Sequence, residues 1–186
     1  MKKFISLIFA LCIIQSVSAQ EIKFDNETYK LKFSTMSSAT KGYGNEYFRG
    51  NEDVSNWLKM IGVYHYPNEN NPIKYAENFD KTIEQTDNCL FLKMIENKSA
   101  SKAVLSFLAN GRQNSKNYFE YDVYKFEKNS QKGMTVTKYA SRFYFNQNKE
   151  IENIAKQIKK DNDKFLELFV ISQTPHIIEK ETITGN

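Results

Sequence analysis

The sequence has little histidine, cysteine, proline or glycine. Its 186 residues include 2 His, 2 Cys, 3 Pro and 7 Gly. So little Gly and Pro excludes collagen-like and low-complexity proteins, and two cysteines cannot build a disulfide scaffold. A structural zinc site needs three or four convergent ligands, whereas His65 and His176 lie in unrelated parts of the chain. We therefore expect no metal and no cofactor.

Motifs of the common catalytic sites are also missing. The chain has no Gly-x-Ser-x-Gly elbow, no Ser-x-x-Lys pair and no glycine-rich phosphate loop. These absences argue against the corresponding hydrolases and nucleotide-binding enzymes. They leave the question of enzymatic activity open, with a non-enzymatic role favoured.

The first nineteen residues have the pattern of a secretory signal peptide. Lys2 and Lys3 precede the apolar run Phe4–Ile14, and Val17-Ser18-Ala19 offers the small residues that signal peptidase reads. The run is too short for a membrane-spanning helix, which needs about 20 residues. We expect cleavage near Ala19, a single domain over residues 20–186 in the periplasm or outside the cell, and no stable membrane insertion.

Cleavage would leave Cys89 as the single cysteine, because Cys12 lies within the apolar run. The segment Cys89-Leu90-Phe91-Leu92 is typical of a buried strand, in which cysteine acts as a small hydrophobic residue. A reactive or intermolecularly paired thiol is the alternative. The loss of Lys2 and Lys3 lowers the formal net charge from +4 to +2. That excess is too small to indicate a nucleic-acid partner.

Alternating and apolar segments predict an antiparallel sheet. Two short strands flank Asp25-Asn26-Glu27, a loop covers residues 34–44, and Glu46-Tyr47-Phe48 follows it. Trp57–Tyr66 is predicted to be a half-buried strand, and we expect Trp57, the only tryptophan, to be a core anchor. Four further strands are predicted around Leu90–Ile95, Ala103–Leu108, Tyr118–Phe126 and Met134–Phe145.

Two segments have helical periodicity. Asn71 can cap a helix that starts at Pro72 and runs to about residue 86. Residues 149–171 carry an apolar stripe opposite mixed charges, which favours a helix that covers a sheet over one that lies on a membrane. We predict an α+β domain with one antiparallel sheet of about six or seven strands, covered by helices at 72–86 and 149–171. A loose tail follows from about residue 174.

The aromatic and basic residues suggest a binding surface. The segment 138–144 interleaves cations with rings, as a single-strand nucleic-acid platform would. Glu120, Asp122 and Glu127 on the neighbouring strand can instead form cross-strand ion pairs with these cations. A tyrosine-rich face then remains for a protein or glycan partner. The candidate binding residues are Glu46, Asp53, Tyr64, Tyr139, Arg142 and Tyr144.

These features favour an exported, non-enzymatic binding module, such as an inhibitor, a toxin-immunity protein or an envelope accessory protein. Its partner is expected to be another protein. The alternative is a small exported hydrolase that uses Glu46, Glu52, Asp53 and His65 as acid and base. That alternative requires the four side chains to converge beside a cleft. Loop capping by the acids and a structural His65 bound to a loop carbonyl explain the same residues.

Two blocks of sequence carry a resemblance to a known family. Glu46-Tyr47-Phe48 with Asn56–Ile61, and later Glu120–Lys125 with Gly133–Arg142, resemble an uncharacterised family of small exported bacterial proteins. Members of that family carry a Trp-x-x-Met block and a Tyr-Ala-x-Arg block. The resemblance implies a periplasmic or secreted domain and supplies no catalytic assignment. The predicted order of elements is also similar to Mog1/PsbP-type layered folds.

Overall fold

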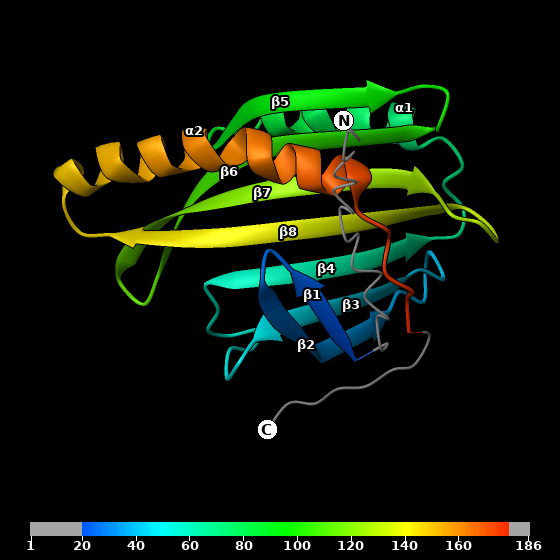
Figure 1. Ribbon diagram of the computed structural model, residues 1–186, viewed down its shortest axis with the longest axis horizontal. Coiled ribbons are helices and arrows are strands. Elements are labelled where there is room, and N and C mark those ends of the chain that lie inside the picture. The colour runs from blue at the N-terminus through cyan, green and yellow to red at the C-terminus, as the bar shows by residue number, and fades with distance from the viewer. Residues whose placement is uncertain (1–19, 179–186) are drawn as a thin grey trace, which may run out of the picture.

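One antiparallel sheet carries the fold of this protein. The structure, a computed structural model, describes residues 20–178 (Figure 1). Two helices, α1 (Pro72–Glu84) and α2 (Asn148–Ile171), accompany the strands. The eight strands are β1 (Glu21–Phe24), β2 (Glu27–Met36), β3 (Tyr43–Arg49), β4 (Lys59–Tyr66), β5 (Cys89–Asn97), β6 (Lys102–Gln113), β7 (Lys116–Lys128) and β8 (Met134–Phe145). The α+β class is confirmed, whereas the sheet has eight strands where the sequence predicted six or seven.

The strand order shows how the sheet is assembled. It is β1-β2-β3-β4-β8-β7-β6-β5, so residues 21–66 and residues 89–145 each form an antiparallel meander. Helix α1 connects the two meanders, and β8 then pairs with β4. The extra strand is β3, which the short segment Glu46-Tyr47-Phe48 only partly revealed because Gly44 and Asn45 interrupt its pattern.

Two tight turns explain two of the hairpins. Asp25 and Asn26 join β1 to β2 with φ values of 47° and 62°, and Asn114 and Ser115 join β6 to β7 with 49° and 64°. Two-residue hairpin loops of this kind need positive φ at both positions, which Asn and Asp tolerate better than most residues. The sequence prediction of a turn at Asp25-Asn26-Glu27 is confirmed.

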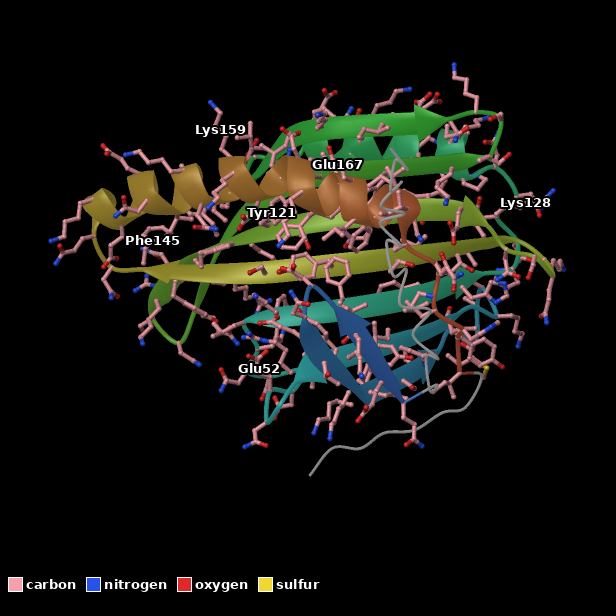
Figure 2. All side chains as sticks on the ribbon, in the orientation of Figure 1. Glu52, Tyr121, Lys128, Phe145, Lys159 and Glu167 are labelled. Atoms are coloured by element: carbon pink, nitrogen blue, oxygen red, sulfur yellow. The ribbon has the colours of Figure 1, made fainter. Side chains whose placement is uncertain are left out.

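The two helices lie on opposite faces of the sheet (Figure 1). On one face, Phe165 and Phe169 of α2 pack in a cluster with Tyr121 and Tyr139. On the other, Ala76 and Ile83 of α1 pack with the apolar side chains of β6, β7 and β8. Figure 2 shows Tyr121 beneath α2, with Lys159 and Glu167 on the helix above it. The two faces are called the α2 face and the α1 face below.

The helix ends follow from local hydrogen bonds. The Asn71 side chain accepts from the Lys74 backbone N–H at 3.1 Å, and Pro72 takes the first position of α1. At the start of α2, the Glu150 carboxylate accepts from the N–H groups of Asn146 and Gln147, at 2.6 and 3.2 Å. Both predicted helices are confirmed, with α1 ending two residues earlier and α2 beginning one residue earlier than predicted.

The C-terminal segment is attached to the sheet as far as the structure describes it. The Asn45 side chain accepts from the Ile178 N–H at 2.7 Å and donates to the Ile178 carbonyl at 3.2 Å. These two bonds imitate the pairing of a strand. The segment that the sequence predicted to be a loose tail is thus attached to β3 at Ile178. The predicted signal peptide and residues 179–186 lie outside the described residues.

A buried lysine closes the C-terminal end of α2. The Lys125 ammonium is fully buried and donates to the Ser172 carbonyl at 2.9 Å and to the Ser172 hydroxyl at 3.3 Å. Its nearest carboxylate, that of Glu127, lies at 3.6 Å. Burial lowers the pKa of Lys125 to about 8, against the opposing effect of Glu127. The folded state therefore tolerates this charge at a cost in stability.

This pKa predicts a pH-dependent difference between the protein and its Lys125→Met variant. Between pH 8 and the unfolded value near 10.5, the unfolded state binds more protons at Lys125, so the free energy of unfolding rises with pH. From pH 7 to pH 9.5, the wild type should gain about 2 kcal/mol relative to Lys125→Met. Urea denaturation at the two pH values measures this gain. Lys128→Met, an exposed change on the same strand, keeps Lys125, so its free energy of unfolding should rise with pH in parallel with that of the wild type. Parallel pH curves for the wild type and Lys125→Met would contradict the prediction.

Candidate functional site

Polar and aromatic residues gather on the α1 face where helix α1 does not cover it. Successive residues of a strand point to opposite faces, so Lys138 and Arg142 of β8 share the α1 face with Glu120 and Asp122 of β7. Helix α1 contacts β5, β6 and β7 on this face. The β3–β4 loop, residues 50–58, packs over the other end through Trp57.

Four charged residues form a row across β7 and β8, called the charged row below. The Lys138 ammonium lies 3.1 Å from the Glu120 carboxylate and 3.0 Å from that of Asp122. The Arg142 guanidinium donates to Glu120 at 2.8 Å. The predicted cross-strand pairs of Glu120 and Asp122 are thereby confirmed. Glu127 instead pairs with Lys102 at 3.2 Å, because it points to the α2 face.

The charged row is largely withdrawn from water. Burial raises the pKa of the Asp122 carboxyl, and the adjacent Lys138 ammonium offsets only part of this effect. Burial would lower the pKa of Lys138, but the attraction of Asp122 and of other neighbours outweighs it and raises that pKa. Removal of one partner would leave the other charge buried and uncompensated, so these residues are costly to substitute.

Arg142 lies between two aromatic rings. Its Cζ atom is 3.7 Å from the centre of the Trp57 ring and 4.8 Å from that of Tyr118. Gln113 accepts from both the Arg142 guanidinium, at 3.1 Å, and the Tyr144 hydroxyl, at 2.6 Å. Arg142 and Tyr144, two of the predicted binding residues, are thus brought together. Cation–π contacts of this kind also hold the loop that carries Trp57 against the sheet.

Trp57 is buried as the sequence predicted. Its side chain is 6% exposed and packs in a small cluster with Phe48, Met60 and Ala140. It does not begin the strand, however, since β4 starts at Lys59. Trp57 is therefore an anchor of the β3–β4 loop, and its ring also contacts Arg142.

Glu46 and Tyr64, two more predicted binding residues, are joined on the same face. The Tyr64 hydroxyl donates to Glu46 at 2.9 Å. The Tyr64 ring lies over Gly62, where a Cβ atom would come within 2.5 Å of ring atoms. Burial, with the Glu46 carboxylate next, raises the pKa of Tyr64 well above its usual value. A side chain at position 62 would push this tyrosine off the sheet.

The remaining two candidates lie elsewhere. Tyr139 is 1% exposed on the α2 face, where its ring packs between Phe24 and Phe165 at centroid distances of 5.4 and 4.7 Å. Its place in the core corrects the prediction of a binding role, because residue 139 has the opposite parity to Lys138. Asp53 is exposed in the β3–β4 loop, where it accepts from the Ser55 N–H at 2.8 Å. Hydrogen bonds from Ser55 lower the pKa of Asp53.

The four residues of the hydrolase hypothesis do not converge. Glu46 lies on the α1 face and His65 on the α2 face, with the sheet between them. His65 Nε2 bonds to the Lys132 carbonyl at 2.8 Å, so the predicted structural contact with a loop carbonyl is confirmed. Asp53 caps its own turn, and Glu52 is engaged by the backbone and by Arg49. Strand alternation thus separates the proposed acid from the proposed base.

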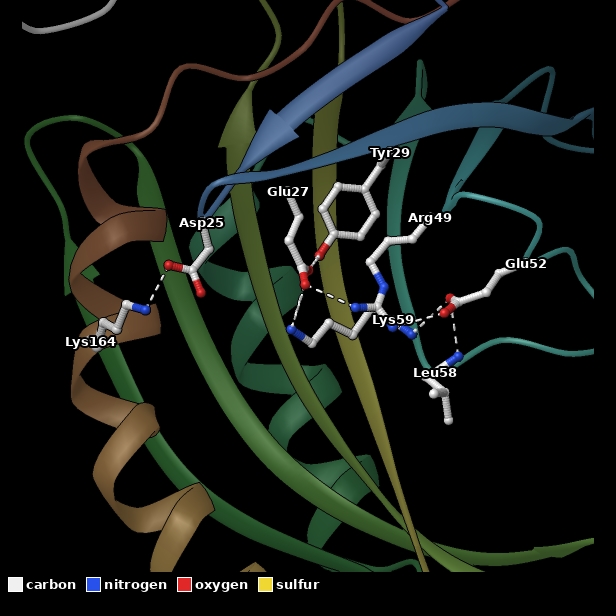
Figure 3. A network of polar contacts seen from close by, with 8 residues as sticks. All are labelled: Asp25, Glu27, Tyr29, Arg49, Glu52, Leu58, Lys59 and Lys164. Atoms are coloured by element: carbon white, nitrogen blue, oxygen red, sulfur yellow. Dashed lines mark hydrogen bonds and ion pairs between the residues drawn. The ribbon is translucent and has the colours of Figure 1, made fainter.

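A network of ion pairs on the other side of the β3–β4 loop fixes its position (Figure 3). The Glu27 carboxylate accepts from Tyr29 at 2.8 Å, from Arg49 at 2.8 Å and from Lys59 at 3.1 Å. Arg49 also bonds to Glu52 at 2.8 Å. Glu52 in turn accepts from the Leu58 and Lys59 N–H groups. Loop capping by Glu52 agrees with the sequence prediction, whereas its ion pair with Arg49 and its contact with the start of β4 depend on how β3, β4 and their loop pack.

Cys89 is the first residue of β5 and is half-buried. Burial raises the pKa of its thiol, and the carboxylates of Asp122 and Glu120 act in the same direction. A raised pKa reduces the thiolate fraction and hence the reactivity. Within residues 20–178, no three His, Cys, Asp or Glu side chains are grouped as metal ligands, and neither helix is long and apolar enough to cross a bilayer.

Comparison with known proteins gives one finding. A protein-family model matches residues 17–172, which include every strand and both helices. The chain belongs to this family. No curated protein and no solved structure matches it. The family match assigns no activity, ligand or location, so the function is argued from the geometry above.

The packing of Trp57 predicts a large loss of stability on truncation. Trp57→Ala should lower the free energy of unfolding by about 3 kcal/mol or more, because it opens a cavity and leaves Arg142 without one of its rings. Leu58→Ala, at a 45% exposed neighbour, should change it by less than about 0.5 kcal/mol. Chemical denaturation measures these changes. Tryptophan fluorescence follows unfolding of the wild type and of Leu58→Ala, and circular dichroism follows unfolding of Trp57→Ala, which has no tryptophan. Equal effects of the two substitutions would show that Trp57 is not an anchor.

Proposed function

We propose that this protein is an exported, non-enzymatic binding module whose partner is another protein. The partner docks on the loop–hairpin surface, defined as the β3–β4 loop together with Tyr118 and Tyr144. Val54 and Leu58, 52% and 45% exposed, project from this loop. They are two of the five most exposed large apolar residues within the described part of the chain. Exposed apolar side chains beside Tyr and Arg are the composition of protein-binding surfaces.

The observation that carries this proposal is the rigid attachment of the loop. Gln113 donates to the Ser55 carbonyl at 2.8 Å and so ties the β6–β7 hairpin to the loop. The Arg142 N–H donates to the Leu58 carbonyl at 2.8 Å, and Glu52 holds the Leu58 N–H from the other side. A surface held in one conformation loses little entropy on binding. Apolar residues on such a rigid loop are better placed for recognition than on a mobile one.

The electrostatics fit a binding surface better than a catalytic site. Every charge of the charged row is paired within the row, and Glu46 is bonded to Tyr64. Paired and buried charges serve register and shape, whereas a general acid or base must reach a substrate. An inhibitor, a toxin-immunity protein or an envelope accessory protein needs only a complementary surface. Export and the likeness to Mog1/PsbP-type folds are parts of this proposal that rest on the sequence.

Site-specific cross-linking tests the proposal. A photoreactive phenylalanine analogue at Leu58 should give a discrete protein adduct in cells that produce this protein. The same analogue at Lys156, an exposed position of α2, is the matched control and should give none. The Leu58 adduct should be lost in a Val54→Asp background, because the added charge disrupts an apolar contact while leaving an exposed residue exposed. Equal adducts at both positions, or none at Leu58, would refute the docking surface.

A further inference from the structure

A cleft lies at the end of the sheet away from the loop–hairpin surface. The C-terminal segment 171–177 forms one side and the end of β7 with the β7–β8 turn forms the other. Its volume is about 710 Å³, within the range of about 300–1,000 Å³ that small-molecule sites occupy. Figure 2 shows Lys128, one of the lining residues, at the end of the molecule opposite Phe145.

The cleft has an excess of positive charge. Lys102 and Lys128 line it, and Glu127 is the one carboxylate among the described residues that do so. That carboxylate is already compensated, since Lys102 lies 3.2 Å and Lys125 3.6 Å from it. Two ammonium groups therefore line the cleft against one carboxylate, and the buried Lys125 ammonium bonds to the lining residue Ser172. This imbalance favours an anion in the cleft over a cation or a neutral molecule.

Two buried polar atoms of lining residues have no hydrogen-bond partner among residues 20–178. They are His65 Nδ1 and Thr174 Oγ1. The other ring nitrogen of His65, Nε2, donates to the Lys132 carbonyl, so Nδ1 of the neutral ring is an acceptor, whereas the Thr174 hydroxyl can donate. Buried polar groups are nearly always satisfied, and each one left without a partner costs free energy. Two such atoms in the same cleft point to a polar occupant.

We infer that this cleft binds a small organic anion that carries a phosphate or carboxylate group. Lys102 and Lys128 attract its charge from the β-strand side. Thr174 donates its hydroxyl proton, and His176 closes the cleft from the tail. The Asn45–Ile178 contact holds the tail in the position that forms the second wall. The site is separate from the loop–hairpin surface, so it stands whether or not a protein docks there.

Calorimetric titration of the full chain at low ionic strength tests the inference. The probes are glycerol 3-phosphate and citrate, one for each anionic group, with glycerol as the neutral control. Saturable binding of at least one anion and none of glycerol is expected. Binding of glycerol 3-phosphate alone would identify a phosphate site, and binding of citrate alone would identify a carboxylate site. Heat signals that fail to saturate for both anions would overturn the inference.

Matched charge reversals locate the binding. Lys116 and Lys128 are the first and last residues of β7, and both are exposed. Lys128→Glu should weaken anion binding at least tenfold, whereas Lys116→Glu should weaken it less than twofold. Thr174→Val, which removes the hydroxyl and keeps the shape, should also weaken binding. Equal effects of Lys116→Glu and Lys128→Glu would show only general attraction of anions to the protein and would overturn the assignment.

Discussion

The antiparallel pairing of β4 with β8 is the constraint on which the rest of this structure depends. It joins two meanders that are separated in the sequence by α1, with Gly62 opposite Lys138 and Met60 opposite Ala140. Without it, the strands of residues 21–66 would have no contact with the charged row. The β3–β4 loop would also lose the cation–π contact between Trp57 and Arg142. This long-range pairing joins the two meanders into one sheet, and each end of that sheet carries one of the two proposed sites.

Charged side chains that are partly or fully buried hold loops in place in this protein. Glu27, Arg49 and Glu52 fix the β3–β4 loop from one side, and Arg142 with Trp57 fixes it from the other. Lys125 ties the end of α2 to β7 in the same manner, at the cost seen in its lowered pKa. Ion pairs withdrawn from water add little net stability, but they oppose any other arrangement of the same groups. The two proposed sites are therefore held by polar contacts and only partly by the apolar core.

The two proposed sites lie at opposite ends of β7. One end presents apolar side chains on a fixed loop, which suits a protein surface. The other encloses a positively charged cleft, which suits a small anion. The residues of the hydrolase hypothesis are divided between these two ends, since Glu52 and Asp53 belong to the loop and His65 to the cleft. The acids of the loop are therefore kept apart from the histidine of the cleft.

The sequence by itself determined the class of the fold, both helices and the second meander, because hydrophobic period and capping residues such as Asn71 act locally. It also predicted the ion pairs of Glu120 and Asp122 and the burial of Trp57. Only the tertiary structure decided that Tyr139 belongs to the core under α2 and Arg142 to the charged row on the α1 face. Alternate residues of β8 point to opposite faces, and the packing of both meanders determines which helix covers each face. The cleft, too, was beyond prediction. It exists because Asn45 holds Ile178, a contact between residues that are far apart in the sequence and that no local pattern connects.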